Sequence, residues 1–443
     1  MTTVHTSARG TASRPTVVVG GGVLGLCVAW ELARWGHQVV VLERDRVGSG
    51  ASRGNAGEIC SSIVGPLPAP GIVSTALKNM YRKDSALYVH PAAALTMGAF
   101  LLRMARNATA ERFHAGVRAL TQLGADTYQR FAALSDNGVG IEVTRREYLY
   151  LFPSRARTER KRAFLREHYP VEHDLGEILD GPELRALEPC LGERAQSGFV
   201  LSGQAQVDPS AFVDALADAL RAGGVVIHEG ARVTRVVPSS RDVRVASTAG
   251  TFTAGHVVIA AGAGSADLTG NLGLNLPVRP GKGYSFSIAP AAPLTRVLKL
   301  EEAHVGAVPL DGVVRIAGTM EFDAMEDRFN RSRIREVVNA AAPYFTGVDW
   351  ARRTAEWMGP RPMTPDGLPF IGAMPGESRV FLATGHNMLG VMMAPSTAHL
   401  LARLIDGQDV PALRPFDPAR APRRRGPRPT GPAAPGRSRR REK

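Results

Sequence analysis

The feature that most constrains this chain is a glycine-rich turn between a short apolar strand and a helix near the N-terminus. Residues 15–19 (PTVVV) are apolar and mostly β-branched, the glycines of Gly20-x-Gly22-x-x-Gly25 follow, and a helical pattern covers 23–35. The first glycine permits a tight turn, the second lets a pyrophosphate approach the backbone, and the third allows close helix-to-strand packing. The helix N-terminus then favours an anion. This arrangement predicts the start of a dinucleotide-binding unit.

An acidic residue at the end of the next strand strengthens this prediction. The second apolar strand is expected at 38–42 and is followed at once by Glu43, which lies 18 residues beyond Gly25. A carboxylate at this place accepts hydrogen bonds from the ribose hydroxyls of the adenosine half. The alternative is a glycine turn that binds no ligand. It is less favoured, because it does not explain why the strand, the helix and the acidic residue occur together.

Length and cysteine content bound the rest of the chain. The 443 residues are 44% hydrophobic and 21% charged, as in globular proteins of two or three domains. The three cysteines, Cys27, Cys60 and Cys190, form no CxxC pair, so we expect neither a disulfide scaffold nor a thiolate metal site. We therefore expect no metal and a reducing, cytoplasmic location.

Most of the positive charge lies in the C-terminal tail. Residues 414–443 carry ten arginines and Lys443 against two acids, which accounts for nine of the thirteen net positive charges. The remaining body is close to neutral, so its charge does not predict specific nucleic-acid binding. Because the tail is rich in proline and poor in apolar residues, we predict that 411–443 is disordered. Docking of this basic tail to an anionic membrane or to nucleic acid stays an alternative, and the oligomeric state stays open.

Periodicity divides the middle of the chain into helical and strand-rich parts. The sequence predicts helices near 72–83, 92–107, 111–136, 155–168, 209–222 and 390–406. It predicts strands at 146–152 and 225–228 and several more within 231–264 and 277–320. The fold class is therefore mixed α/β, with a split dinucleotide-binding domain interleaved with a second domain. A short N-terminal extension is expected at 1–14.

Several further segments carry a resemblance to a known family. They are ASRGNAGEI in the 48–59 loop, APG at 69–71, VDP at 207–209, VVIAAGAGS from 257, RPGKGYS at 279–285, RIAGTMEF at 315–322, GPRPMTPDGLPFIG at 359–372 and ATGHNMLGVMMAPST at 383–397. Together with the glycine turn they resemble the D-amino-acid oxidase superfamily of flavoproteins, and within it the D-amino-acid dehydrogenase branch. The resemblance covers roughly residues 15–410.

The resemblance implies FAD, a Rossmann-like FAD-binding domain in three pieces, and a substrate domain whose antiparallel or mixed sheet covers the flavin. The pieces of the FAD-binding domain are then 15–62, 206–269 and 356–410, and those of the substrate domain are 63–205 and 270–355.

The resemblance also implies individual site residues. Arg361 becomes the clamp for the substrate carboxylate, which its planar charged fork suits; a structural surface arginine is the alternative. Tyr284 lines the pocket or packs in the second sheet, and His386 acts beside the flavin or caps a turn. The residues expected to contact FAD are Gly20, Gly22, Val23, Leu24, Gly25, Glu43, Arg44, Ser52, Asn55, Ala56, Gly57, Val233, Ala261, Gly262, Gly385, His386, Met388, Leu389 and Gly390.

Two departures from relatives sharpen this interpretation. Relatives of the glycine oxidase type carry an arginine where this chain has Met388, and the GHxxLG form here matches the dehydrogenase branch instead. Relatives that bind flavin covalently use His or Cys, and 48–59 contains neither. Cys60 is nearby, but a packed thiol is the simpler interpretation. We therefore expect FAD without a covalent link.

The activity implied is oxidative deamination of a D-amino acid to a 2-oxo acid and ammonia, by hydride transfer from Cα to flavin N5. An oxidase or dehydrogenase of secondary amino acids, of the sarcosine, glycine or proline type, is the nearest alternative. A non-enzymatic module that binds nucleic acid or membrane through its tail is the alternative from another class. The electron acceptor, a quinone or oxygen, stays open, as does peripheral attachment to the inner face of a membrane.

Overall fold

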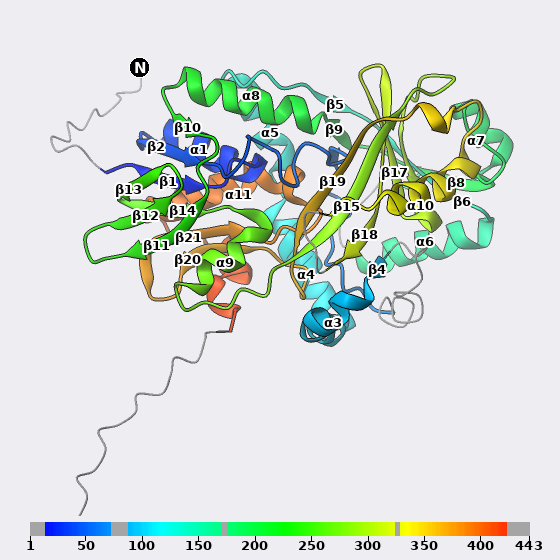
Figure 1. The fold of residues 1–443 in the computed structure, drawn as a ribbon. Coiled ribbons are helices and arrows are strands. Elements are labelled where there is room, and N and C mark those ends of the chain that lie inside the picture. The colour runs from blue at the N-terminus through cyan, green and yellow to red at the C-terminus, as the bar shows by residue number, and fades with distance from the viewer. Residues whose placement is uncertain (1–13, 72–86, 170–174, 324–327, 423–443) are drawn as a thin grey trace, which may run out of the picture.

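The structure, a computed structural model, describes residues 14–71, 87–169, 175–323 and 328–422. These residues form two domains that lie side by side (Figure 1). One is built on a six-stranded sheet and the other on a nine-stranded sheet, with helices against both. The mixed α/β class predicted from the sequence is confirmed. The helix expected near 72–83 lies outside the described residues.

The six-stranded sheet is assembled from three distant parts of the chain. Its order is β10-β2-β1-β14-β21-β20, and all neighbours are parallel except β21 and β20. The strands are β1 (Thr16–Val19), β2 (Val39–Leu42), β10 (Val226–His228), β14 (His256–Ile259), β20 (Phe370–Met374) and β21 (Glu377–Thr384). The predicted βαβ start and the strands that join it from the middle and the C-terminal part of the chain are therefore present.

Alternate side chains of β1 enter different cores. Val18 packs with the helices α1 (Val23–Arg34), α8 (Pro209–Ala222) and α11 (Gly390–Ile405). Val17 and Val19 pack on the other face, against a meander of β11 (Val233–Pro238), β12 (Val243–Ser247) and β13 (Gly250–Ala254). This period-two alternation buries both faces of the sheet, as a parallel sheet requires.

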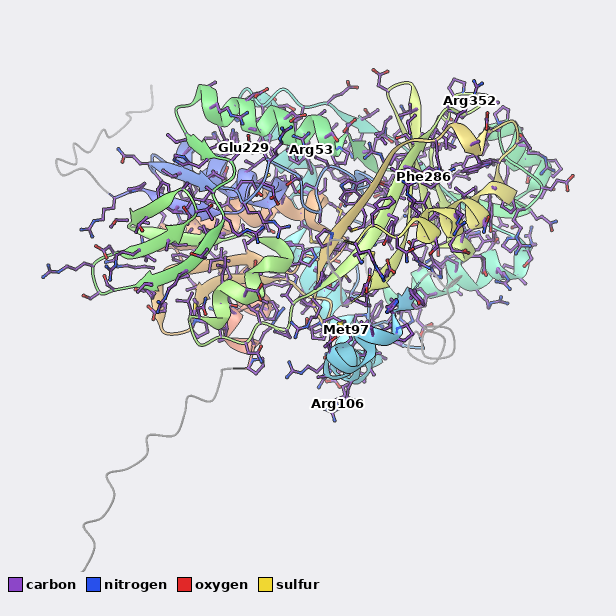
Figure 2. The ribbon with its side chains drawn as sticks, viewed as in Figure 1. Arg53, Met97, Arg106, Glu229, Phe286 and Arg352 are labelled. Atoms are coloured by element: carbon purple, nitrogen blue, oxygen red, sulfur yellow. The ribbon has the colours of Figure 1, made fainter. Side chains whose placement is uncertain are left out.

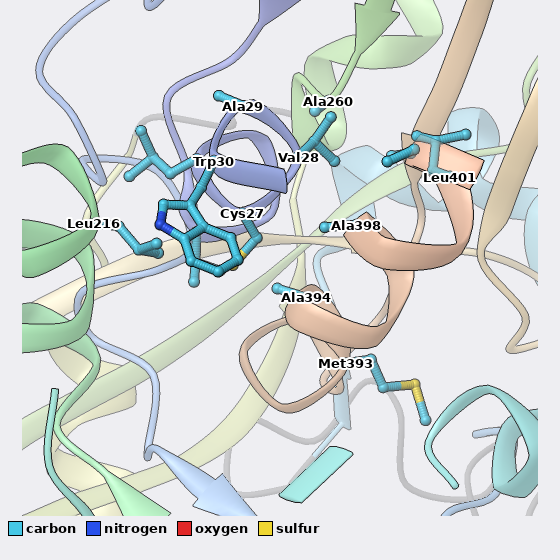
Figure 3. Close-up of a cluster of buried hydrophobic side chains, with 14 of the residues drawn as sticks. Cys27, Val28, Ala29, Trp30, Leu216, Ala260, Met393, Ala394, Ala398 and Leu401 are labelled. Atoms are coloured by element: carbon cyan, nitrogen blue, oxygen red, sulfur yellow. The ribbon is translucent and has the colours of Figure 1, made fainter. Parts of the chain in front are cut away.

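Small residues let α1 and α11 approach closely. Figure 3 shows Cys27 and Val28 of α1 on the side of that helix that faces Ala394 and Ala398 of α11. All four side chains are at most 1% exposed. The start of α1 is thereby fixed over the edge of the sheet where its strands end.

Local sequence signals explain the limits of α8. The Asp208 carboxylate accepts hydrogen bonds from the backbone N–H groups of Ser210, at 2.7 Å, and Ala211, at 3.2 Å. Pro209 occupies the first helical position, where no N–H is needed. Gly224, with φ 80°, turns the chain into β10. The predicted helix and the strand after it are confirmed.

The nine-stranded sheet forms the second domain. Its order is β19-β15-β18-β17-β16-β6-β8-β7, and β4 pairs with β18. The strands are β4 (Leu87–Val89), β6 (Tyr148–Phe152), β7 (Leu179–Asp180), β8 (Ser197–Leu201), β15 (Arg279–Ile288), β16 (Val297–Leu300), β17 (Val305–Leu310), β18 (Val313–Phe322) and β19 (Thr354–Met363). A small sheet of β3 (Glu58–Ile59), β9 (Ala205–Val207) and β5 (Val143–Arg145) lies separately. Since β19 pairs with β15, we move the expected domain boundary at 356 to a point after β19.

The two faces of β15 have different partners. Tyr284 and Phe286 point into a core shared with Ile334 and Val337 of α10 (Arg331–Ala341); Figure 2 labels Phe286 within this sheet. Ser285 points the opposite way, because its hydroxyl donates to the Gly54 carbonyl at 2.9 Å. The face that carries Ser285 is therefore the one turned toward the first domain.

The remaining helices are α3 (Ala94–Asn107), α4 (Ala110–Leu123), α5 (Thr127–Asp136), α6 (Arg155–His168), α7 (Gly181–Leu187) and α9 (Ser265–Gly270). The first four correspond to predicted helical ranges, whereas α7, α9 and α10 were not predicted from the sequence. The prediction of a single helix at 111–136 is wrong, because the helix is interrupted between α4 and α5. Gly124 ends α4, and the Asp126 carboxylate accepts from the Ser396 hydroxyl of α11 at 2.7 Å. Helical periodicity in the sequence cannot reveal this tertiary contact.

The start of the C-terminal tail is ordered, which corrects the expectation of disorder from 411 onward. Residues 411–416 and 418–420 form short 3₁₀ turns in which Leu413 and Phe416 are buried. The Arg420 guanidinium lies 3.6 Å from the centroid of the Phe370 ring and donates to the Leu368 carbonyl at 2.6 Å. A few well-placed apolar and cationic side chains therefore order a segment whose composition predicts disorder. Residues 423–443 lie outside the described part of the chain.

We expect Phe416→Ala to lower the free energy of unfolding by about 3–5 kcal/mol, because it leaves a cavity where a fully buried ring now packs. The measurement is urea-induced unfolding followed by circular dichroism. Arg414→Ala is the matched control, since that side chain is 73% exposed, and it should change the free energy by less than about 0.5 kcal/mol. Equal small effects of both variants would show that the segment does not contribute to the fold.

Candidate active site

The turn between β1 and α1 can only be built with glycines. Gly20 has φ 111°, and a Cβ there would lie 2.5 Å from the Ala260 carbonyl oxygen. A Cβ on Gly25 would lie 1.9 Å from the Gly20 carbonyl oxygen. Gly22 is the N-cap of α1 and has no side chain to cover the helix end. The motif therefore exposes backbone N–H groups at the N-terminus of α1.

The start of α1 is suited to an anion. No acidic side chain lies in its first turn, and the Val23 N–H donates to the Ser52 hydroxyl oxygen at 3.0 Å. Leu24 and Gly25 belong to the same first turn. The partial positive charge of the helix end and the Ser52 hydroxyl together can bind a phosphate.

Glu43 stands at the end of β2, as the sequence predicts. Its side chain is 8% exposed, and its two oxygens accept from the backbone N–H groups of Gly21 at 2.6 Å and Asp45 at 2.9 Å. A carboxylate has lone pairs left for two hydroxyl donors after these bonds. Arg44 is exposed and forms an ion pair with Asp45.

The chain returns to Glu43 just before β11. The Ala231 N–H donates to the Glu43 carbonyl oxygen at 2.7 Å, and Val233 begins β11 two residues later. This places Val233 near the carboxyl end of β2, and its contact with FAD stays a prediction.

The 48–59 loop lies between the two sheets. Gly57 has φ 76°, a Cβ there would lie 2.0 Å from the Val207 carbonyl oxygen, and the Asn55 side-chain oxygen accepts from the Gly57 N–H at 2.8 Å. Ala56 packs partly buried against the second domain. On the other side of the loop, Arg53, which is labelled in Figure 2, forms an ion pair with Asp214 of α8 at 2.5 Å. The loop thus contacts the first domain through Arg53 and the second through Ala56.

The turn after β14 completes this edge of the sheet. Gly262 has φ 55°, and its carbonyl oxygen accepts from the Thr384 hydroxyl at 2.9 Å. Ala261 lies beside Gly20, because a Cβ on Gly20 would be 3.1 Å from the Cα of Ala261. The expected residues of β1, β14 and β21 therefore meet at one place.

The segment before α11 is fixed to the end of β19. Gly385, with φ 80°, and Asn387, with φ 54°, turn the chain. The Asn387 side-chain oxygen accepts from the Thr364 N–H at 2.9 Å, and its backbone N–H donates to the Pro362 carbonyl at 3.1 Å. Asn387 was not predicted from the sequence; the available signal was an asparagine two residues after Gly385, because asparagine tolerates the left-handed region better than most residues. It joins the helix start to the strand that carries Arg361.

His386 is a neutral buried side chain. Its Nε2 lies 3.1 Å from the Thr397 hydroxyl oxygen, whereas its Nδ1 is buried without a hydrogen-bond partner in the described part of the chain. Burial lowers the pKa of this imidazole to about 3. Met388 is 47% exposed, and Leu389 and Gly390 begin α11, which has no acid in its first turn.

Arg361 lies on the face of β19 that is turned toward the first domain. Its Nη1 donates to the Thr319 carbonyl at 2.8 Å, and its Cζ would be 2.2 Å from a Cβ on Gly283. Burial lowers the pKa of the guanidinium to about 10, which leaves it charged at neutral pH. Among the described residues it has no carboxylate partner, so its remaining N–H groups can bind an anion.

Tyr284 lies on the opposite face of the sheet. It is fully buried, packs against α10, and its hydroxyl donates to Glu321. Burial, and then the Glu321 carboxylate, raise the pKa of the Tyr284 phenol well above its usual value. The packing interpretation of Tyr284 therefore replaces the pocket interpretation, because neighbours in a strand point to opposite faces.

Trp357 was also not predicted, although it lies beside the 48–59 loop. Its indole occupies the space next to two glycines: a Cβ on Gly54 would be 1.9 Å from the ring, and one on Gly359 would be 2.0 Å from it. The available signal was Gly359, two residues after the tryptophan. On a strand these two residues share a face, so the glycine leaves room for the indole ring.

Comparison with known proteins identifies the family. The FAD dependent oxidoreductase (DAO) family matches residues 16–404. The chain belongs to this family. It is 33% identical over 402 residues to a D-amino acid dehydrogenase of Cereibacter sphaeroides, covering 88% of this chain and 92% of the relative. It is 32% identical over 404 residues to D-amino acid dehydrogenase 1 of Mesorhizobium japonicum, covering 88% and 96%.

The fold is also that of solved structures. Glycine oxidase from Geobacillus kaustophilus superposes with a TM-score of 0.71 at 24% identity, over 93% of this chain and 99% of that one. These findings confirm the expected family, the fold class, the assignment as an FAD-dependent oxidoreductase, and FAD as the cofactor.

The residues of this oxidoreductase fit FAD. The glycine turn and the start of α1 suit the pyrophosphate, the two free lone-pair positions of Glu43 suit the ribose, and the unpartnered Nδ1 of His386 suits a polar atom of the flavin. Within the described residues there is no cluster of three or more metal-ligating side chains. That part of the chain also has no helix long and apolar enough to cross a membrane.

We expect Gly25→Val to reduce the FAD content of the purified enzyme to less than about a tenth, because the added side chain must push α1 away from Gly20. The ratio of flavin to protein absorbance measures this. Gly98→Ala is the matched control: it lies in α3, and nothing is within 4 Å of the added Cβ. Full FAD content in the Gly25 variant would contradict the assignment of the turn.

We also expect the flavin to be released on acid precipitation, leaving a colourless pellet. The 48–59 loop offers no attachment residue, and burial raises the pKa of the Cys60 thiol to about 11, which disfavours the nucleophilic thiolate. Yellow colour that stays with the precipitated protein would show a covalent link.

Proposed function

We propose that this oxidoreductase converts a D-amino acid to the corresponding 2-oxo acid and ammonia. One observation carries the proposal: a partly buried arginine, Arg361, faces the FAD-binding domain with no carboxylate partner among the described residues. A carboxylate is the ligand that a planar, permanently charged fork binds in two places. The names of the relatives in Cereibacter sphaeroides and Mesorhizobium japonicum support a D-amino acid as its source.

The division of work in the reaction follows from the site. Bound FAD would supply the redox chemistry, as the acceptor of the hydride from the substrate Cα. Arg361 binds the carboxylate and so fixes the orientation of Cα and the amine. The product imine then takes up water and releases ammonia. The low pKa of the His386 imidazole keeps this side chain neutral, so it adds no positive charge near the start of α11.

The second candidate function is oxidation of a secondary amino acid. This is the alternative that the sequence leaves open; glycine oxidase from Geobacillus kaustophilus shares the fold. An anaerobic comparison of D-alanine, D-proline and sarcosine, read by bleaching of the flavin band, separates the two. Faster bleaching by sarcosine than by any primary D-amino acid would overturn our proposal. The electron acceptor, quinone or oxygen, and peripheral membrane attachment stay predictions.

We expect Arg361→Ala to lower kcat/KM for a D-amino acid by roughly 30-fold to several thousand-fold. Loss of one partner of a buried charge pair costs about 2–5 kcal/mol, and each 1.36 kcal/mol is a factor of ten. Arg361→Lys restores the charge but not the fork, so it should recover only part of the loss. Steady-state kinetics on flavin-saturated variants provide the measurement.

An amine without a carboxylate is the control substrate for these variants. Its slow oxidation should hardly change, because it makes no use of the arginine. If the amine and the amino acid lose activity by the same factor, Arg361 supports the fold or the flavin rather than the substrate.

A further inference from the structure

A β-bulge interrupts the pairing of β15 with β18 directly beside Arg361. Lys282 pairs with Glu321 and Tyr284 pairs with Gly318, so two residues of β18 stand opposite Gly283 alone. One of these two residues is Thr319, whose φ is 59°. This left-handed conformation is unfavourable for a β-branched residue, and such strain is found where a function retains it.

The bulge and the glycine together hold the guanidinium in place. The bulged backbone presents the Thr319 carbonyl to Nη1 of Arg361 at 2.8 Å. Gly283 leaves the space that the guanidinium occupies, since a Cβ there would be 2.2 Å from its Cζ. Only one hydrogen bond of Arg361 is used in this way among the described residues, and the rest of the fork stays available.

The bulged residue Thr319 also carries a hydroxyl group that lacks a hydrogen-bond partner among the described residues. The Thr319 hydroxyl oxygen is buried and has no hydrogen-bond partner in the described part of the chain. A buried hydroxyl without a partner is disfavoured, and in native proteins it calls for an explanation. Thr319 therefore carries a hydroxyl donor without an acceptor, and its carbonyl holds a guanidinium that has no carboxylate partner among the described residues. A carboxylate has two oxygens, so it can accept from a guanidinium and from a hydroxyl.

We propose that Thr319 is a specificity-determining residue whose hydroxyl donates to the substrate carboxylate that Arg361 binds, an inference that rests on the proposed function. The ligand class is a monocarboxylate small enough to reach the bulge. The strained backbone of Thr319 then serves to place its carbonyl against Arg361 and its hydroxyl beside the bound carboxylate. A glycine would relieve the strain but remove the donor.

The test uses the FAD-loaded enzyme and acetate as the probe, titrated through the change in the visible flavin spectrum. Thr319→Val keeps the shape and the β-branch but removes the donor, so we expect acetate to bind about tenfold more weakly. Thr319→Ser keeps the hydroxyl and should stay within about twofold of the unmodified enzyme. With a D-amino acid, the loss in Thr319→Val should appear in KM more than in kcat, and a carboxylate-free amine should be unaffected.

Two further variants separate the hydroxyl from the strain and from general stability. Thr319→Gly should raise the melting temperature and still bind acetate about tenfold more weakly, because it relieves the backbone but lacks the donor. Thr121→Val is the matched control, since that threonine on α4 also has a buried hydroxyl without a partner. It should leave acetate binding unchanged.

Unchanged acetate binding in both Thr319→Val and Thr319→Gly would overturn the inference. If D-amino acids still bleach the flavin in that case, the proposed function stands without it. If no D-amino acid bleaches the flavin but acetate binding still depends on the Thr319 hydroxyl, the carboxylate site stands and the proposed function fails.

Discussion

The approach of α1 to β1 is the contact on which the rest of the structure depends. Gly25 lies so close to the Gly20 carbonyl that a single methyl group would collide with it. This approach sets the depth at which α1 rests on the sheet, and the small residues between α1 and α11 transmit it to the C-terminal helix. The ends of β1, β14 and β21 are thereby aligned with the starts of both helices. An anion-binding edge arises from backbone geometry before any charged side chain is considered.

The 48–59 loop connects this edge to the substrate domain. The Ser285 hydroxyl and the Arg315 guanidinium, both on the large sheet, donate to carbonyl oxygens of Gly54 and Arg53, at 2.9 and 3.0 Å. Desolvation lowers the pKa of Arg315, as expected for a cation held mainly by backbone carbonyls. The face of β15 that carries Ser285 and the strand that carries Arg361 are therefore positioned relative to the cofactor edge by hydrogen bonds to main chain. Because these acceptors are main-chain carbonyls, side-chain changes within the loop do not remove them.

The sequence predicted what is local and missed what depends on register. The glycine turn, Glu43 and α8 follow from neighbouring residues, so their prediction needed no tertiary information. The pocket interpretation of Tyr284 was wrong because strand pairing, and not the GKGYS motif, decides which face a residue occupies. The order at Phe416 and the break at Gly124 come from contacts with distant segments. The role of Thr319 depends on a bulge that no periodicity reveals.

The order of strands in the six-stranded sheet has a consequence for synthesis of the chain. Its centre is formed by β1 and β14, but the strand that pairs with β14 on the far side, β21, ends only at Thr384. Until the ribosome has made that strand and the helix after it, β14 presents an unpaired edge and the apolar face of α1 lacks its cover. Such edges favour association between nascent chains. Because its sheet joins strands far apart in sequence, the cofactor domain completes its fold late in synthesis, and a chain halted before residue 377 is a candidate for chaperone binding.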